Sequence, residues 1–128
     1  MITVDRLMTC QMVNIEAGTS TIEAAKLMKI HKIGSVFVKQ KGCIIGIVTE
    51  PDIIRKVVGA ERVPYYIPVE DFMSSPVIGI DGHRSVTEAA DLMEQHGTRH
   101  LAVLKDNSIV GIISVRDLLH PVSIDDFY

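Results

Sequence analysis

Two short motifs in the sequence place a hydroxyl and a carboxylate three residues apart, Thr49 with Asp52 and Ser114 with Asp117. Each pair follows an apolar run typical of a strand and precedes a run typical of a helix. Free backbone amides and the positive end of a helix dipole would make such a junction an anion site. The hydroxyl could donate to a phosphate oxygen, and the carboxylate could accept from both hydroxyls of a ribose. The spacing is also close to that of a helix-capping box, so the motifs indicate either a sugar-phosphate site or two ordinary helix caps.

The elements that must position these motifs occur twice in the chain. A shift of 65 residues aligns the two halves without a gap, and residues 20–55 match residues 85–120 at 12 of 36 positions. Composition alone would give about two or three identities. The match indicates a duplication, so one structural interpretation must serve both halves. The most similar segments are 4–9 with 69–74, 20–28 with 85–93, and 44–49 with 109–114.

Each half predicts the element order β-α-β-β-α, which gives an α+β fold. Ser20 and Ser85 precede helices with an apolar stripe, and a glutamate three residues after each serine completes a capping box. Gly97 suits the left-handed conformation that ends a helix. Gly46 and Gly111 would let a backbone or a ligand approach the strand closely. The predicted strands are 12–15, 35–39 and 43–48 in the first half and 77–80, 101–104 and 109–113 in the second, with hairpin turns at 41–42 and 106–107; the last helix of each half begins near Pro51 or after Ser114 and ends by Gly59 or Pro121.

The duplication divides the chain into four parts. These are a first repeat over 1–60, a linker over 61–68, a second repeat over 69–122 and an acidic C-terminal tail over 123–128. A three-stranded sheet with helices on one face leaves its other face apolar. Because a half of about 60 residues makes little core alone, we expect the two repeats to pack against each other through their sheets.

Composition and charge exclude several classes of protein. The 128 residues carry 13 Lys and Arg against 16 Asp and Glu, a net charge of −3, which argues against a nucleic-acid partner. No apolar run approaches the ~20 residues of a membrane span, and the first ten residues lack the pattern of a signal peptide. The two cysteines differ in spacing and setting, which favours a reduced, cytoplasmic protein.

Neither a metal site nor a catalytic centre is expected. His31 and His96 occupy equivalent positions at helix ends, where histidine favours the helix dipole. His96 and His100 are four residues apart, but Gly97 and the start of a strand intervene. The sequence has no Walker loop, no nucleophile elbow and no Cys–His pair outside the repeat pattern. We therefore expect a protein that is not an enzyme, and the alternative enzyme hypothesis is a small nucleotide hydrolase.

The repeated motifs resemble those of the cystathionine-β-synthase (CBS) domain family, in the tandem arrangement called a Bateman module. The resemblance covers residues 1–120. It rests on the Val-x-x-x-Met-Thr/Ser openings at 4–9 and 69–74, the Ser-x-x-Glu-Ala-Ala-x-Leu-Met helices at 20–28 and 85–93, and the closing segments Gly-Ile-Val-Thr-Glu-Pro-Asp at 46–52 and Gly-Ile-Ile-Ser-Val-Arg-Asp at 111–117.

This resemblance implies a regulatory module that binds adenosine-containing ligands in clefts between the repeats. AMP, ADP or ATP are the expected ligands, and NAD or S-adenosylmethionine are alternatives. Such modules pair into a flat homodimer, so the expected function is an energy or metabolite sensor with no cofactor. The expected partners are the nucleotide, a second copy of the chain and an unidentified regulated protein.

The resemblance also implies roles for residues beside the two motifs. Arg99 and His100 stand where basic residues of the family reach phosphates, and a guanidinium suits that task. The first repeat has Gly34 and Ser35 there, and Pro51 where the second has Arg116. We therefore expect two unequal sites, the stronger around Ser114 and Asp117. Four apolar residues could hold an adenine ring or belong to the core. The candidate ligand-binding residues are Val13, Ile33, Ser35, Thr49, Asp52, Ile78, Arg99, His100, Leu101, Ser114, Arg116 and Asp117.

The main alternative to a nucleotide sensor is a structural or protein-interaction module with empty clefts. The linker contains Tyr65 and Tyr66, which could carry a ligand-induced change to a partner protein. Thr/Ser-x-x-Asp motifs that serve only as caps would fit this alternative.

Overall fold

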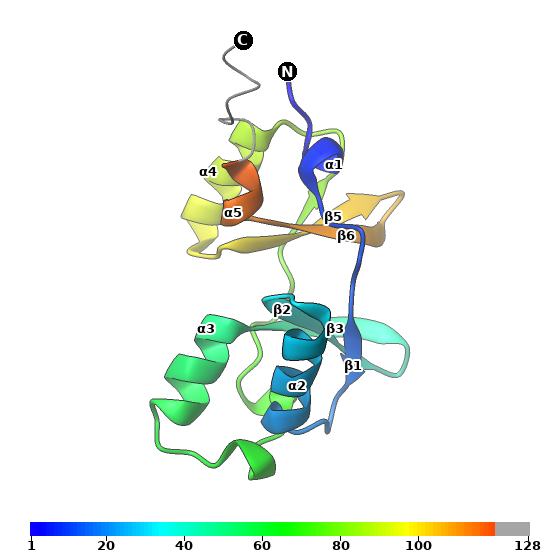
Figure 1. Cartoon of the computed structure of the whole chain (residues 1–128). Helices are drawn as coiled ribbons and strands as arrows, with labels where there is room; N and C mark the ends of the chain where they lie inside the picture. The colour runs from blue at the N-terminus through cyan, green and yellow to red at the C-terminus, as the bar shows by residue number, and fades with distance from the viewer. Residues whose placement is uncertain (120–128) are drawn as a thin grey trace. The chain divides into compact units, whose positions relative to one another are not determined.

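The computed structural model describes residues 1–119 and divides the chain into two compact units (Figure 1). The central unit contains residues 13–77, and the terminal unit joins residues 1–12 to those from 78 onwards. Each unit has one three-stranded sheet, in the order β1-β2-β3 or β4-β5-β6. The first two strands of each sheet are parallel and the last two antiparallel. The mixed α+β fold predicted from the duplication is confirmed.

The elements of the central unit follow the predicted order with two additions. In chain order they are β1 (Asn14–Glu16), α2 (Thr21–His31), β2 (Ser35–Gln40), β3 (Cys43–Thr49), α3 (Glu50–Ile53), a π-helical turn (Ile54–Val58) and 3-10 turns at Pro64–Tyr66 and Val69–Asp71. The helix predicted over 51–59 thus begins as an α-helix and continues as a π-helix, and the predicted linker contains a 3-10 turn that the sequence analysis did not foresee.

The terminal unit repeats this plan. Its elements are α1 (Val4–Leu7), β4 (Gly79–Asp81), α4 (Val86–His96), β5 (His100–Lys105), β6 (Ser108–Ser114) and α5 (Val115–Leu118). The short helix α1 was not predicted. The predicted end of the last helix at Pro121 and the acidic tail at 123–128 lie outside the described residues.

The helices are bounded by caps of the predicted kind. The Ser20 and Ser85 side chains accept from the backbone N–H groups of Glu23 and Glu88, at 3.2 and 3.1 Å. Helix α4 ends at Gly97 with φ +63°, as predicted, and α2 ends at Lys32 with φ +54°. Lysine there was not predicted, because a left-handed conformation costs a residue with a Cβ about 1 kcal/mol or more.

Both hairpins have left-handed residues at the predicted turns. The φ values are +53° at Lys41, +78° at Gly42, +52° at Asp106 and +64° at Asn107. Two consecutive positive φ angles match the right-handed twist of the flanking strands. Each hairpin also has a register irregularity, after Val38 or Val103.

The two sheets each have one face covered by helices, α2 and α3 or α4 and α5 (Figure 1). Alternation along the strands directs Val36, Val38 and Val48 into the central core, and Leu101, Val103 and Ile113 into the terminal core. On the opposite face, Phe37 pairs with Ile47 and Ala102 with Ile112. Each sheet is therefore apolar on both faces, as the sequence predicted.

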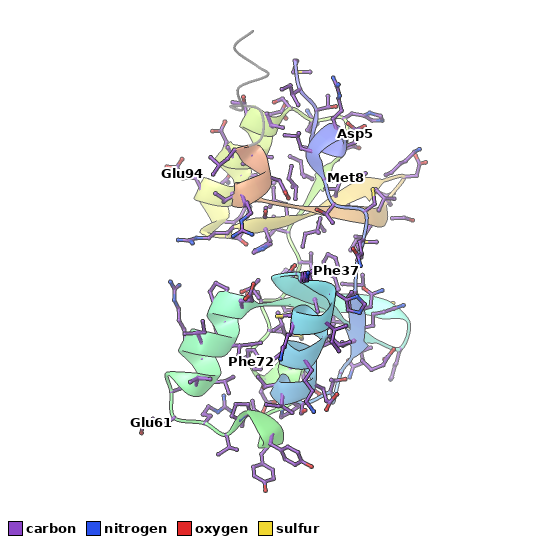
Figure 2. All side chains as sticks on the ribbon, in the orientation of Figure 1. Asp5, Met8, Phe37, Glu61, Phe72 and Glu94 are labelled. Atoms are coloured by element: carbon purple, nitrogen blue, oxygen red, sulfur yellow. The ribbon has the colours of Figure 1, made fainter. Side chains whose placement is uncertain are left out.

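The compact units and the sequence repeats have different bounds, because the opening segments are exchanged. Thr9, in the opening of the first repeat, pairs with Ile112 through two backbone hydrogen bonds of 2.9 and 3.0 Å. Ser74, in the opening of the second repeat, pairs with Ile47 in the same way. Each opening segment therefore extends the sheet of the other repeat. Met8, which is labelled in Figure 2, lies on the first of these segments.

The exchanged opening segments explain why glycine is needed at positions 46 and 111. A Cβ at Gly46 would lie 2.5 Å from Met73 Sδ and 3.0 Å from the Ser74 carbonyl oxygen. A Cβ at Gly111 would lie 2.7 Å from Met8 Sδ and 3.0 Å from the carbonyl oxygen of Thr9. Of the two predicted reasons for these glycines, a close backbone or a close ligand, the structure shows the backbone.

Candidate functional site

Both candidate motifs stand where the last strand of a unit becomes a helix. We call this place the central junction at Thr49 and Asp52, and the terminal junction at Ser114 and Asp117. Thr49 ends β3 and caps α3, and Ser114 ends β6 and caps α5. The backbone N–H of Thr49 donates to Asp52 Oδ2 at 3.2 Å, and that of Asp52 donates to Thr49 Oγ1 at 3.3 Å. The corresponding distances for Ser114 and Asp117 are 2.8 and 3.3 Å. Both motifs are therefore complete capping boxes.

These caps use most of the backbone donors that the sequence analysis expected to be free. The backbone N–H of Glu50 donates to the Gly34 carbonyl at 3.0 Å, and that of Val115 donates to the Arg99 carbonyl at 2.9 Å. The next residue in the central unit is Pro51, which has no N–H. Of the first-turn amides of α3 and α5, the one without a recorded partner among the described residues belongs to Arg116. The predicted anion site of free amides is therefore wrong for the central unit and reduced to one amide in the terminal unit.

What the terminal junction still offers is the second carboxylate oxygen. Asp117 Oδ2 accepts from the backbone N–H of Ser114 and from its hydroxyl, at 2.8 and 3.1 Å. In the part of the chain that the structure describes, no partner is recorded for Asp117 Oδ1. The Asp117 side chain is half-buried, so this oxygen is a positioned acceptor. A carboxylate oxygen of this kind can accept a hydrogen bond from a sugar hydroxyl.

In the central unit the second carboxylate oxygen of Asp52 is in an ion pair. Lys56 Nζ lies 3.3 Å from Asp52 Oδ1 and donates to the Phe72 carbonyl at 3.2 Å. The sequence analysis missed Lys56, although its spacing of four residues from Asp52 on a predicted helix is the usual signal for an ion pair. The position 65 residues later is Pro121, which carries no charge.

The predicted basic residues gather at the terminal junction. His100 pairs with Ser114 in the β5–β6 register, and the Arg99 carbonyl receives the first amide of α5. Arg99 and Arg116 are both exposed. The structure therefore brings together five of the predicted residues at one end of this sheet: Arg99, His100, Ser114, Arg116 and Asp117.

The central junction has the opposite charge. Ser35 pairs with Thr49 as predicted. A Cβ at Gly34 would lie 2.8 Å from Glu50 Oε1, which places a second carboxylate beside Asp52. Counting Glu50, Asp52 and Lys56 gives −1 − 1 + 1 = −1, whereas Arg99, Arg116 and Asp117 give +1 + 1 − 1 = +1. An anionic ligand is therefore favoured at the terminal junction.

The four apolar candidates divide into two groups. Val13, Ile33 and Ile78 are partly buried and pack at the margin of a core. The Val13 and Ile78 carbonyls accept from the N–H groups of Phe37 and Ala102, at 3.0 and 2.9 Å. Leu101 is 0% exposed inside the terminal core. Of the two roles that the sequence left open for Leu101, adenine contact or core, this enclosure by its own unit favours the core.

A groove that Glu50 of the central junction also lines lies on the helical side of the central unit. It has a volume of about 360 Å³ and lies between α2 and α3. Its lining residues are Ala25, Met28, Lys29, Glu50, Ile53 and Ile54. Nearby apolar side chains on the same helices are open to solvent, with Ile30 71% and Val58 57% exposed.

Residues 1–119 contain no group of three or more His, Cys, Asp or Glu side chains placed to hold a metal ion. His31 and His96 are the last residues of α2 and α4, as predicted, and His100 belongs to a strand. Cys10 and Cys43 are exposed and free. Within the same residues, no helix is long and apolar enough to span a membrane.

Comparison with known proteins identifies the family. The model of the CBS domain matches the chain twice, over residues 4–59 and 69–123. The chain therefore belongs to the CBS-domain family and contains a tandem pair of these domains.

Three relatives illustrate the match. The CBS domain-containing protein YhcV of Bacillus subtilis is 32% identical over 111 residues, covering 87% of this chain and 79% of the relative. The solved structure of a protein with CBS domains from Burkholderia ambifaria superimposes with a TM-score of 0.89 at 33% identity, covering 98% and 96% of the two chains. The CBS domain pair of protein MJ0100, solved with 5′-methylthioadenosine and S-adenosyl-L-methionine, shares the fold with a TM-score of 0.81 at 22% identity, covering 94% and 99%.

Proposed function

We propose that the chain is a regulatory module that binds an adenosine-containing ligand at the terminal junction. The observation that carries this proposal is Asp117, whose Oδ2 is held by the cap while Oδ1 remains an acceptor beside two exposed arginines. The carboxylate accepts from the ribose hydroxyls, and Arg99 and Arg116 face the phosphate. Membership of the CBS family supports this assignment.

The proposed ligand is an adenine nucleotide such as AMP, ADP or ATP. The formal charge of +1 at this junction favours a phosphate-bearing ligand over a neutral nucleoside. S-adenosylmethionine and NAD are the alternatives, since both contain the same ribose diol. The CBS domain pair of MJ0100 was solved with two adenosine compounds, one of them S-adenosyl-L-methionine. The test therefore includes S-adenosylmethionine.

A sensor of this kind acts through its conformations. A ligand shifts the balance between two arrangements of the module by as much as its affinities for them differ. We place this module in the cytoplasm, as a homodimer. The exposed apolar side chains on the helices of the central unit, Ile30, Ile54 and Val58, support the pairing with a second copy.

The test is thermal unfolding with AMP, ADP, ATP, NAD and S-adenosylmethionine. A ligand at a hundred times its dissociation constant stabilises the folded state by about 2.7 kcal/mol. We expect Asp117→Asn to lose this stabilisation, because asparagine keeps one acceptor for the cap and loses the second carboxylate oxygen. The matched control, Asp52→Asn, keeps it. Stabilisation by none of the five ligands would contradict the proposal.

One observation favours a second candidate function, that of a protein-interaction module. Tyr65 and Tyr66 are 69% and 75% exposed on the 3-10 turn of the central unit, with ring centroids 5.3 Å apart and planes at 81°. Exposed tyrosines on a short turn are typical of binding hot spots. If the ligand panel gives no stabilisation, this surface becomes the leading functional candidate.

A further inference from the structure

We propose that Lys56 is an intramolecular competitor that keeps the ribose-binding carboxylate of the central unit occupied. This inference rests on the proposed function, in which the junction aspartates accept from sugar hydroxyls. It adds that one lysine makes the two junctions differ in ligand selectivity. The Lys56 ammonium already lies beside Asp52, where a ligand hydroxyl would bind.

The position of the Lys56 ammonium is defined by two acceptors. It lies 3.3 Å from Asp52 Oδ1 and 3.2 Å from the Phe72 carbonyl oxygen. Phe72 is 5% exposed, and the segment that contains it is held to β3 by the two hydrogen bonds between Ser74 and Ile47. The carbonyl is therefore a fixed partner. It keeps the ammonium beside Asp52 even though the Lys56 side chain is 46% exposed.

The competition follows from the charge and the space beside Asp52 Oδ1. The cap uses Asp52 Oδ2 through the backbone N–H of Thr49, so Oδ1 is the oxygen that faces a diol. A neutral hydroxyl must then enter the place that the Lys56 ammonium holds in its ion pair with this oxygen. Among residues 1–119 no ammonium is recorded beside Asp117 Oδ1, and the residue equivalent to Lys56 in sequence is Pro121.

The size of the effect is limited by solvent. Asp52 is 16% exposed and Lys56 46% exposed, and partly exposed ion pairs are weak. We therefore expect removal of the lysine charge to tighten binding at the central junction by about two- to fivefold, and not to change the fold.

The experiment is a titration with adenosine, followed through the backbone amide signals of residues 49–52 and 114–117 by NMR. Adenosine contains the ribose diol and no phosphate, so Lys56 cannot be drawn away by a phosphate charge. The same titration with 2′-deoxyadenosine removes the diol. The variants are Lys56→Met, which removes the charge, and Lys56→Gln, which removes the charge but can still donate to the Phe72 carbonyl. The matched control is Lys26→Met, which breaks the exposed ion pair between Lys26 and Glu23 on α2.

In the unaltered protein, we expect residues 114–117 to respond at lower adenosine concentration than residues 49–52. Lys56→Met and Lys56→Gln should lower the concentration needed at 49–52 and leave 114–117 unchanged, whereas Lys26→Met should change neither. The gain should be absent with 2′-deoxyadenosine.

Three outcomes would overturn the inference. If Lys56→Met leaves or weakens the response at 49–52 while 114–117 still respond, Lys56 is not a competitor and the proposed function stands. If the amide signals of both junctions shift at the same adenosine concentration in the unaltered protein, Lys56 does not hinder binding at the central junction. If no residue responds in any of the proteins, the inference and the proposed function both fail.

Discussion

In the central unit, Thr49 and Asp52 cap a helix beside Glu50, and the second oxygen of Asp52 is bound to Lys56. In the terminal unit, Ser114 and Asp117 form the same capping box beside two exposed arginines, and the second oxygen of Asp117 has no recorded partner among residues 1–119. The duplicated chain has thus kept one cap geometry in two electrostatic settings. Local folding requires the cap in both units, whereas the side chains around the cap differ between the units.

The same comparison identifies residues that serve folding in both units. Leu101 and Val36 occupy equivalent positions in the two repeats, and both are buried in a core. The duplicated glycines, Gly46 and Gly111, both accommodate an exchanged opening segment. These features, which are common to both units, therefore concern folding.

The largest effect is expected from the buried pair. Leu101→Ala should lower the free energy of unfolding by about 2–5 kcal/mol, because it leaves a cavity in the terminal core. Val36→Ala should cost roughly 1 kcal/mol less, since it removes one methylene fewer. Urea unfolding followed by circular dichroism measures both. Leu119→Ala, at a residue 65% exposed, is the control. A stable Leu101→Ala variant that had lost ligand binding would instead place Leu101 at the ligand.

A smaller loss is expected from the glycines. Gly46→Ala and Gly111→Ala should each destabilise the protein by about 1–3 kcal/mol, because the new Cβ meets a methionine and a backbone carbonyl. Adding Met73→Ala to Gly46→Ala should recover part of the loss, since the Ser74 carbonyl remains 3.0 Å away. Native-state hydrogen exchange at the Ile47 and Ile112 amides measures whether the hydrogen bonds to the opening segments are weakened. Alanine tolerated at both positions would mean that the opening segments are not held as described.

The smallest effect is expected from the caps. Thr49→Ala and Ser114→Ala should each cost about 1 kcal/mol, with the larger loss at Ser114 because its hydroxyl also donates to Asp117. Thermal unfolding in the absence of ligand measures these losses. Ser108→Ala, at an exposed strand residue, is the control and should stay within about 0.5 kcal/mol. Caps that could be removed without any loss would leave ligand binding as the sole role of the motifs.

The sequence predicted the local structure well where the signal is local. Ser20 and Ser85 cap helices because a serine side chain reaches the amide three residues on, whatever the rest of the chain does. The turns at 41–42 and 106–107 have positive φ angles because glycine and asparagine tolerate that conformation. The helix end at Lys32 was not predicted, because lysine has no preference for the left-handed region that the surrounding structure imposes.

The candidate site was predicted in part. Register between β5 and β6 brings His100 to Ser114, and both were candidates from their place in the repeat. Leu101 was left with two possible roles because a strand residue next to a candidate site faces either the core or the ligand, and periodicity alone does not decide which. Lys56 was missed although its ion-pair partner Asp52 is four residues away, and only its second contact, with the Phe72 carbonyl, depends on the tertiary fold. Glu50 was missed because its contact runs to Gly34, which the fold brings close.

By itself, the sequence determined the duplication, the α+β elements, the caps and the family, since these depend on residue types at fixed short spacings. The tertiary structure alone decided that each opening segment joins the sheet of the other repeat, and that the Phe72 carbonyl holds the Lys56 ammonium beside Asp52. The physical reason is that both contacts depend on which distant groups meet, and a repeated pattern is compatible with more than one partner.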